Sequence, residues 1–206
     1  MSIKVLGIST SPRQNSNSDL LLRQALAGAE SSGAETEYIR LGDLKIAPCI
    51  ECNSCYKQGT CIVEDDYQML SSKMLEADRL ILATPIFFMT FCAQAKTLID
   101  RCQCLWAHKY VLKQPLITTS RDRRAMVIAV GGTKSKKMFD SISLTAKYFI
   151  DVLEMNYAAN LFVNNIDAPG RIKQHPSALN EAFRLGRELV STDTPPHEKP
   201  INVELT

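Results

Sequence analysis

The fold is decided by residues 4–29, which read KVLGISTSPRQNSNSDLLLRQALAGA. A short apolar run, Lys4 to Ser9, ends in a polar turn, and the apolar residues that follow recur at helical spacing. This order predicts a strand, a loop and a helix. Because the rest of the chain repeats the same alternation, the stretch sets the architecture of the whole molecule.

Four further strands are expected along the chain. The runs RLILATP (79–85) and AMVIAVGG (125–132) are continuously apolar, as strands buried on both faces are. The runs TEYIRL (36–41) and NYAANLFVNN (156–165) supply the other two. Helices are expected over 65–75, 93–106, 138–153 and 177–190. Strands alternating with helices predict an α/β fold with a doubly wound, five-stranded parallel sheet of order 2-1-3-4-5.

The chain is expected to form one domain. Its 206 residues and 45% hydrophobic content suit a single core. We assign residues 1–191 to this domain, with a cysteine-rich loop inserted at 47–63. Residues 192–206 are rich in proline and charge, so we expect an extended arm or a disordered tail there.

The charge balance and the apolar runs exclude several classes of protein. There are 24 Lys and Arg against 22 Asp and Glu, a net charge of +2, which argues against a nucleic-acid partner. No stretch reaches the roughly 20 apolar residues of a membrane span, and no signal peptide is recognisable, so no membrane partner and a cytoplasmic location are expected. In a reducing compartment, clustered cysteines indicate metal binding or redox chemistry more often than disulfides.

Three loops should meet beyond the carboxyl ends of the strands, where open α/β sheets bind ligands. They span residues 9–18, 84–91 and 131–137. The first carries the groups that suit a phosphate monoester at a helix N-terminus: Ser9, Ser11, Arg13, Ser16, Asn17 and Ser18. The motifs GxGxxG and GxxxxGK[ST] are missing, which argues against a dinucleotide and a P-loop nucleotidase. The alternative is a polar loop in which Ser16 or Asn17 is a plain N-cap.

The second loop, PIFFMTF (85–91), is unusually apolar for a surface segment. A flat aromatic ligand or a subunit contact would explain this composition. Alternatively, Phe87, Phe88 and Phe91 fill the core.

The cysteine loop holds four of the seven cysteines within thirteen residues. Cys49, Cys52, Cys55 and Cys61 follow the pattern C-x2-C-x2-C-x5-C, which supplies the four thiolates of a 4Fe-4S cluster. Zinc, or unliganded thiols, are the alternatives. We expect the remaining three, Cys92, Cys102 and Cys104, to be small buried hydrophobes.

The segments GISTSPRQNSNS, TPIFFMTFCAQAKTLIDR and the GGT turn resemble the flavin-contacting segments of the flavodoxin-like NADPH-dependent FMN reductases. With CIECNSC, the chain most resembles the iron-sulfur flavoproteins of that family. The resemblance implies that the first loop holds the FMN phosphate and that the four cysteines of the loop hold a 4Fe-4S cluster. It implies flavin contacts for Pro85, Ile86, Phe87, Phe88, Gly131, Gly132 and Thr133. Phe87 stands where the family often has a tyrosine, so a hydroxyl contact to the flavin is lost there.

The expected function is a flavin-dependent oxidoreductase that passes electrons between a one-electron carrier such as ferredoxin and a two-electron acceptor. The resemblance implies a homodimer or homotetramer. Two alternatives are an NAD(P)H-dependent FMN or quinone reductase without a functional cluster, and a non-catalytic redox sensor. Lys134, Lys136 and Lys137 border the expected flavin site and could steer an acidic carrier. A second basic run, Arg121, Arg123 and Arg124, is expected to be solvated surface.

Overall fold

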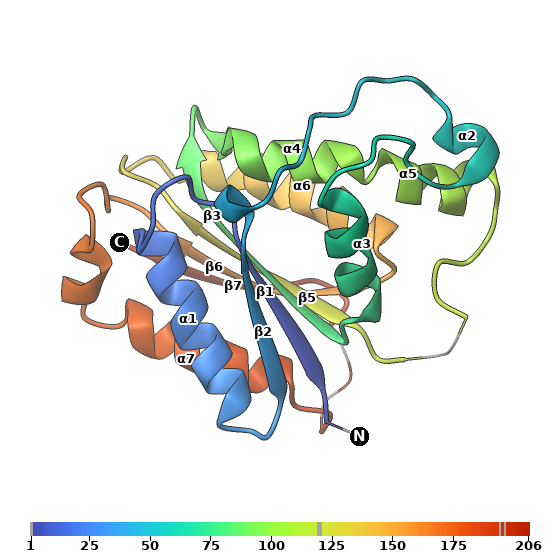
Figure 1. The fold of residues 1–206 in the computed structure, drawn as a ribbon. Coiled ribbons are helices and arrows are strands. Elements are labelled where there is room, and N and C mark those ends of the chain that lie inside the picture. The colour runs from blue at the N-terminus through green and yellow to red at the C-terminus, as the bar shows by residue number, and fades with distance from the viewer. Residues whose placement is uncertain (1, 119–120, 194, 196) are drawn as a thin grey trace.

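A computed structural model describes residues 2–118, 121–193, 195 and 197–206, so Thr194 and Pro196 of the expected tail lie outside the described residues. Figure 1 shows a twisted sheet with helices on both faces. The strands are β1 (Lys4–Ser9), β2 (Glu35–Arg40), β3 (Arg79–Phe87), β4 (Thr90–Phe91), β5 (Arg124–Val130), β6 (Asn156–Val163) and β7 (Ile201–Leu205). The helices are α1 (Asn17–Glu30), α2 (Cys55–Gln58), α3 (Tyr67–Glu76), α4 (Ala93–Arg101), α5 (Gln103–Trp106), α6 (Met138–Val152) and α7 (Ala178–Leu189).

The sheet order is β2-β1-β3-β5-β6-β7. Its first five strands are the expected ones, all parallel and in the expected order, which confirms the doubly wound fold. Two strands were not foreseen. The two-residue β4 folds back antiparallel on the end of β3, and β7 adds a parallel strand beside β6, with Val203 opposite Leu161. The end of the expected tail therefore belongs to the sheet.

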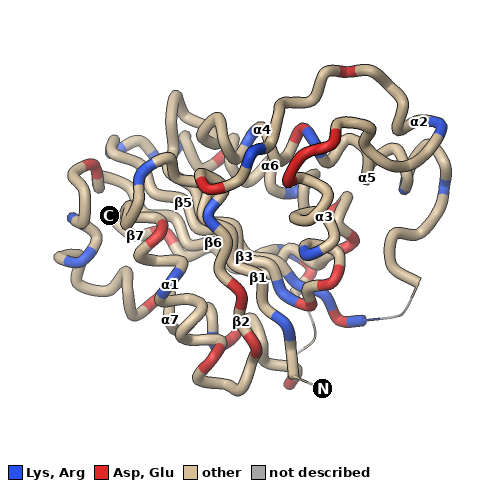
Figure 2. The backbone as a smooth tube through the Cα atoms, in the orientation of Figure 1, with Lys and Arg blue, Asp and Glu red and all other residues tan. Residues whose placement is uncertain are grey.

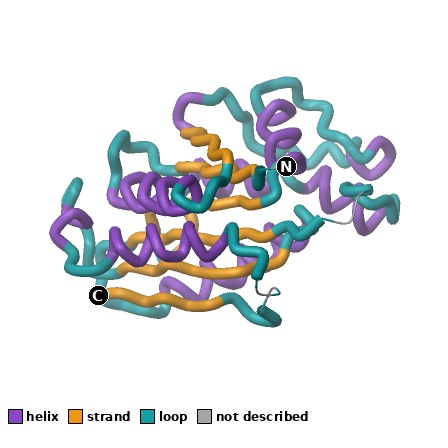
Figure 3. The backbone as a smooth tube through the Cα atoms, turned by 90° about the horizontal axis from the view of Figure 1, so that it is seen from below, coloured by secondary structure: helices purple, strands orange, loops and turns teal. Residues whose placement is uncertain are grey.

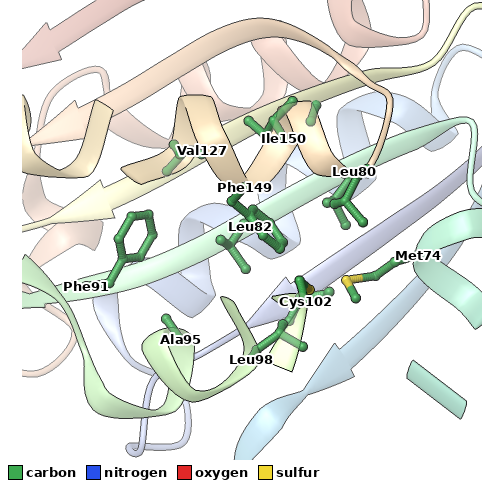
Figure 4. Close-up of a cluster of buried hydrophobic side chains, with 14 of the residues drawn as sticks. Met74, Leu80, Leu82, Phe91, Ala95, Leu98, Cys102, Val127, Phe149 and Ile150 are labelled. Atoms are coloured by element: carbon green, nitrogen blue, oxygen red, sulfur yellow. The ribbon is translucent and has the colours of Figure 1, made fainter. Parts of the chain in front are cut away.

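Helices cover both faces of the sheet (Figure 3). Helices α1 and α7 pack on one face, where Gly28 lies against the backbone of α7 and Gly186 against the backbone of α1. A Cβ atom at Gly186 would approach the carbonyl oxygen of Ala25 to 1.9 Å, so these glycines let the two helices touch. Helices α3, α4 and α6 cover the other face. Figure 4 shows Phe149, Leu82 and Leu98 pointing toward one another in that layer.

Two of the three arginines around the start of β5, Arg123 and Arg124, are buried, so the expectation of a solvated run is wrong for them. The Arg123 guanidinium donates hydrogen bonds to backbone carbonyls at the ends of α3 and α6, including Met74 (2.7 Å) and Leu153. Arg124 reaches the carbonyl of Ser191 after α7 at 3.0 Å. Positive charge at helix C-termini is favourable, and these carbonyls would otherwise lack donors. Burial lowers the pKa of Arg123 to about 10, which still leaves it charged at neutral pH.

Charged residues of both signs are interspersed along the backbone (Figure 2). Among the described residues, none of the helices combines the length and the apolar character that a membrane crossing requires.

Candidate functional site

The first loop joins the end of β1 to the N-terminus of α1. Ser16 is the N-cap: its Oγ accepts a hydrogen bond from the backbone N–H of Asp19 at 3.2 Å and lies 3.2 Å from Oγ of Ser18. The preceding residue, Asn15, has φ of +50°, so the chain turns sharply into the helix. A 14-residue helix that begins with buried hydroxyls offers N–H groups and a positive dipole end to an anion.

The other expected phosphate contacts lie in different surroundings. Arg13 is exposed, and its backbone N–H donates to Oγ of Ser11 at 3.2 Å. Ser9 is buried beside Tyr38, whose pKa is raised by burial and by the hydrogen bond to Asp19. Ser11 and Arg13 therefore lie in the loop itself, while Ser9 lies beneath it.

Asn17 has a structural task in this fold. Its Nδ2 donates to the carbonyl of Ala168 at 3.0 Å, and its Oδ1 accepts from the N–H of Ile172 at 3.2 Å. The side chain thus ties the start of α1 to the segment after β6. A contact between Asn17 and the phosphate stays a prediction, and the side chain would keep one amide hydrogen for it.

The second loop is a two-residue turn between β3 and β4. Phe88 and Met89 have φ of +48° and +66°, values that such hairpin turns usually assign to Asn and Gly. Phe88 is fully exposed, at 102% of its reference area, and Phe87 is half-exposed. Phe91 is buried, so the core-filling alternative holds for Phe91 alone. Ser141 of α6 donates its hydroxyl hydrogen to the carbonyl of Met89 and fixes the turn.

The third loop follows β5 at the same edge of the sheet. Gly131 lies so close to Met138 that a Cβ atom would meet its Sδ at 2.4 Å. The N–H of Gly131 donates to Val163 at 2.9 Å, and the carbonyl of Thr133 accepts from Asn165 at 2.9 Å. These contacts fix the conformation of the loop, in which Gly132 and Thr133 are exposed.

Cys92 links the first two loops from below. It is fully buried, as expected, and its Sγ lies 3.3 Å from Oγ1 of Thr10 and 3.5 Å from Oγ1 of Thr84. Thr10 also bonds the carbonyl of Ala83 through its backbone N–H at 2.9 Å. These contacts therefore fix the position of the loop after β1 relative to the end of β3.

The cysteine loop lies away from the α1 N-terminus, above α4 and α5 (Figure 1). All four of its cysteines line one cavity of about 730 Å³, together with residues of α4, α5 and α6. Cys49 and Cys52 are exposed, and Cys55 and Cys61 are half-buried. The donor set therefore fits a four-thiolate centre. Among the described residues, however, no three His, Cys, Asp or Glu side chains are already placed to hold a metal ion.

The pKa values of the thiols in this loop depend on neighbouring groups. Burial raises the pKa of Cys55, and the charges of Cys52, Cys49 and Cys61 raise it further. The backbone N–H and hydroxyl of Ser54 lower the pKa of Cys52. Four thiolates so close together repel one another, and a cation is what removes that cost.

Arg101 and Asp65 lie at the base of the cysteine loop, and no pairing between them was expected from the sequence. They form a buried ion pair, with Nη1 of Arg101 2.6 Å from Oδ2 of Asp65. Burial disfavours the charged carboxylate of Asp65, but hydrogen bonds from Arg101 and from the N–H groups of Ala47 and Tyr67 outweigh burial and lower its pKa. Asp65 begins one expected helix and Arg101 lies in another, 36 residues further along the chain, so no local pattern indicated this pairing.

The family model described as NADPH-dependent FMN reductase matches residues 3–166. The chain belongs to this family. An iron-sulfur flavoprotein of Methanocaldococcus jannaschii is 46% identical over 193 residues, which cover 91% of this chain and 95% of that protein. One of Archaeoglobus fulgidus is 37% identical over 187 residues, covering 91% and 79%. Within the family, the chain is therefore one of the iron-sulfur flavoproteins and a flavin-dependent oxidoreductase.

Solved structures agree on the fold. An NAD(P)H:quinone oxidoreductase from Methanothermobacter marburgensis superposes with a TM-score of 0.74 at 16% identity, covering 97% of this chain and all of that one. A flavodoxin from the domain Archaea superposes with a TM-score of 0.54 at 11% identity, covering 91% and 96%. These similarities confirm the expected flavodoxin-like architecture.

Proposed function

We propose that the protein binds FMN at the carboxyl edge of β1, β3 and β5 and a 4Fe-4S cluster in the cysteine loop, and that it passes electrons between a one-electron carrier and a two-electron acceptor. The observation that carries the proposal is the cavity that all four loop cysteines line. The match to the FMN reductase family and the similarity to iron-sulfur flavoproteins support both cofactors.

The FMN site uses the three loops in different ways. The N–H groups at the start of α1, the hydroxyls of Ser16 and Ser18, and the Arg13 guanidinium suit the dianionic phosphate. Pro85, Ile86 and Phe87 would contact the ribityl chain and the ring, and Gly132 and Thr133 would lie at its far edge.

When bound, a flavin can take up one or two electrons and a 4Fe-4S cluster one at a time, so the pair can join one-electron to two-electron chemistry. The protein supplies the surroundings. The cysteines must be deprotonated to bind iron, and the Ser54 donors favour the thiolate of Cys52. Contacts through Cys92 fix the relative positions of the loops after β1 and β3, which border the proposed flavin site.

An oligomer is part of the proposal. The Phe88 turn is strained and fully exposed, and strained exposed residues are a mark of functional surfaces. Around the cysteine cavity, Ile62, Trp106, Leu144 and Tyr148 are also exposed. Two apolar surfaces on one chain, one protruding and one hollow, support a homodimer or homotetramer in which the Phe88 turn of one copy meets the cysteine side of another.

The decisive experiment is an anaerobic purification with iron, acid-labile sulfide and FMN counted per chain. We expect four irons, four sulfides and one FMN, and a brown protein. Flavin without sulfide would overturn the cluster.

That outcome would favour the second candidate, an FMN or quinone reductase without a cluster, with NAD(P)H as donor. Its specific support is the match of residues 3–166 to the family model described as NADPH-dependent FMN reductase. Rapid reduction of the bound flavin by NADPH, in protein without iron, would identify it.

A further inference from the structure

The cysteine loop, residues 47–63, contains little regular structure besides the four-residue α2. Its two ends nevertheless meet at one side chain. Nη1 of Arg101 donates to the carbonyl of Ala47 at 2.8 Å, and Nη2 donates to the carbonyl of Val63 at 3.0 Å. Arg101 is the last residue of α4 and is 1% exposed, so a buried guanidinium closes the loop at its base.

Asp65 completes the closure. Its two oxygens accept from Nη1 and Nη2 of Arg101 at 2.6 and 3.1 Å, the bidentate geometry in which Arg–carboxylate pairs are strongest. The same carboxylate accepts the backbone N–H of Ala47 at 2.8 Å and that of Tyr67 at 2.9 Å. The guanidinium also lies 4.6 Å from the centre of the Tyr67 ring. All of these contacts are between protein groups.

Arg101 also belongs to the cavity that the four cysteines line. The hydrogen bond with Asp65 and the charge of Cys61 raise the pKa of Arg101, although burial lowers it. Its Nε is buried and has no hydrogen-bond partner among the described residues. A fixed positive charge with a spare donor thus stands beside the last cysteine of the motif.

We propose that Arg101 is a positioning residue for the cysteine loop: with Asp65 it joins the two ends of the loop before iron arrives, and it holds a permanent positive charge next to the Cys61 thiolate. The role of the positive charge rests on the proposed cluster, whereas the joining of the two loop ends does not. Positive charge near a cluster stabilises its more negative, reduced state, so Arg101 would raise the reduction potential.

The test compares Arg101→Gln, Arg101→Lys and a control, Lys73→Gln, which removes an ion pair with Glu37 away from the cysteine cavity. The first measurement uses the iron-free full chain and trypsin. Lys57 is the one basic residue between positions 46 and 63. We expect Arg101→Gln to be cut after Lys57 about tenfold faster than wild type, because charge-assisted hydrogen bonds that close the loop are lost. The control should be cut at the wild-type rate.

The second measurement is the reduction potential of the iron centre in loaded protein, followed by electron paramagnetic resonance. Arg101→Gln should shift it to lower values, and Arg101→Lys, which keeps the charge, should restore most of the shift. A purely structural role would change the cleavage rate and the thermal midpoint but leave the potential of the loaded fraction unchanged.

Equal cleavage of wild type and Arg101→Gln would overturn loop closure, and equal potentials would overturn the charge role. If Arg101→Gln does not fold, Asp65→Asn replaces it, because this change keeps the carbonyl contacts of Arg101 and removes the carboxylate. Wild-type protein without iron would instead overturn the proposed function, and the cleavage rates would still decide whether Arg101 closes the loop.

Discussion

The first loop and the cysteine loop hold their ligand groups in opposite ways. At the start of α1, the donors are backbone N–H groups and short buried hydroxyls, and Ser16 and Ser18 are already hydrogen-bonded in place. In the cysteine loop, the donors are thiols, two of them exposed and two half-buried.

The difference teaches that the two kinds of donor group differ in what they cost the fold. A helix creates its N-terminal donors by forming, so the anion site costs little beyond the helix itself. Thiolates repel one another, so their convergence requires the cation. We therefore expect flavin binding to be largely independent of the cysteine loop.

The largest expected effect is the complete loss of one cofactor while the other stays bound. Cys52→Ala should abolish bound iron and sulfide while leaving FMN at one per chain, because the two sites use separate loops. The matched control is Cys102→Ala, since burial raises the pKa of that thiol to about 12 and keeps it protonated. Iron and flavin contents per chain are the measurement. Loss of FMN together with iron in Cys52→Ala would break the comparison.

A second change tests the first loop. Ser16→Asp keeps an N-cap acceptor for the N–H of Asp19 but places negative charge where the phosphate is proposed to bind. We expect FMN affinity, measured by fluorescence titration of the flavin-free protein, to fall about 100-fold. Riboflavin, which has no phosphate, serves as the control ligand and should bind both proteins alike. Unchanged FMN affinity would place the phosphate elsewhere.

The smallest effect concerns which region meets the electron carrier. Lys136 forms an ion pair with Glu204 at 3.1 Å, whereas Lys134 and Lys137 make none within the described residues. Replacing Lys134 and Lys137 with glutamate should slow reduction by ferredoxin several-fold, up to about tenfold at low salt, and flatten its salt dependence. The control, Lys57→Glu on the cysteine loop, should leave the rate unchanged. If Lys57→Glu were the slower variant, the carrier would dock on the cysteine side.

Much of this fold can be predicted from the sequence because its decisive signals are local. The short apolar runs that became β3 and β5 are typical of strands buried on both faces, and the polar turn after β1 leads directly into α1. The strand β7 could not be predicted in this way. Its five residues, INVEL, are half-exposed and follow a proline-rich segment, and only pairing with β6 makes them a strand.

Some features of the candidate site could likewise be predicted from the sequence, and others could not. The spacing of the four cysteines is visible in thirteen consecutive residues, and so is the run of hydroxyls before α1. The roles of Asn17 and Arg101 are not, because their partners lie 151 and 36 residues away along the chain. The burial of Arg123 was missed for a related reason. A basic run in a sequence predicts solvated side chains. The approach of helix ends from other parts of the chain, which buries Arg123, is not visible in that run.

The first strand begins and the last strand ends on opposite sides of the molecule, β1 at the amino ends of the parallel strands and β7 at their carboxyl ends (Figure 1). β7 ends beside the loop after β5: the carbonyl of Leu205 accepts from the N–H of Asn164 at 3.0 Å, and Glu204 pairs with Lys136. β1 begins at the amino ends of the strands, beside Asp78. A tether joined after Thr206 would therefore crowd the entrance where a carrier is expected to dock. Attachment through the amino end would turn that entrance toward the solution, which is the orientation to choose for wiring the protein to an electrode.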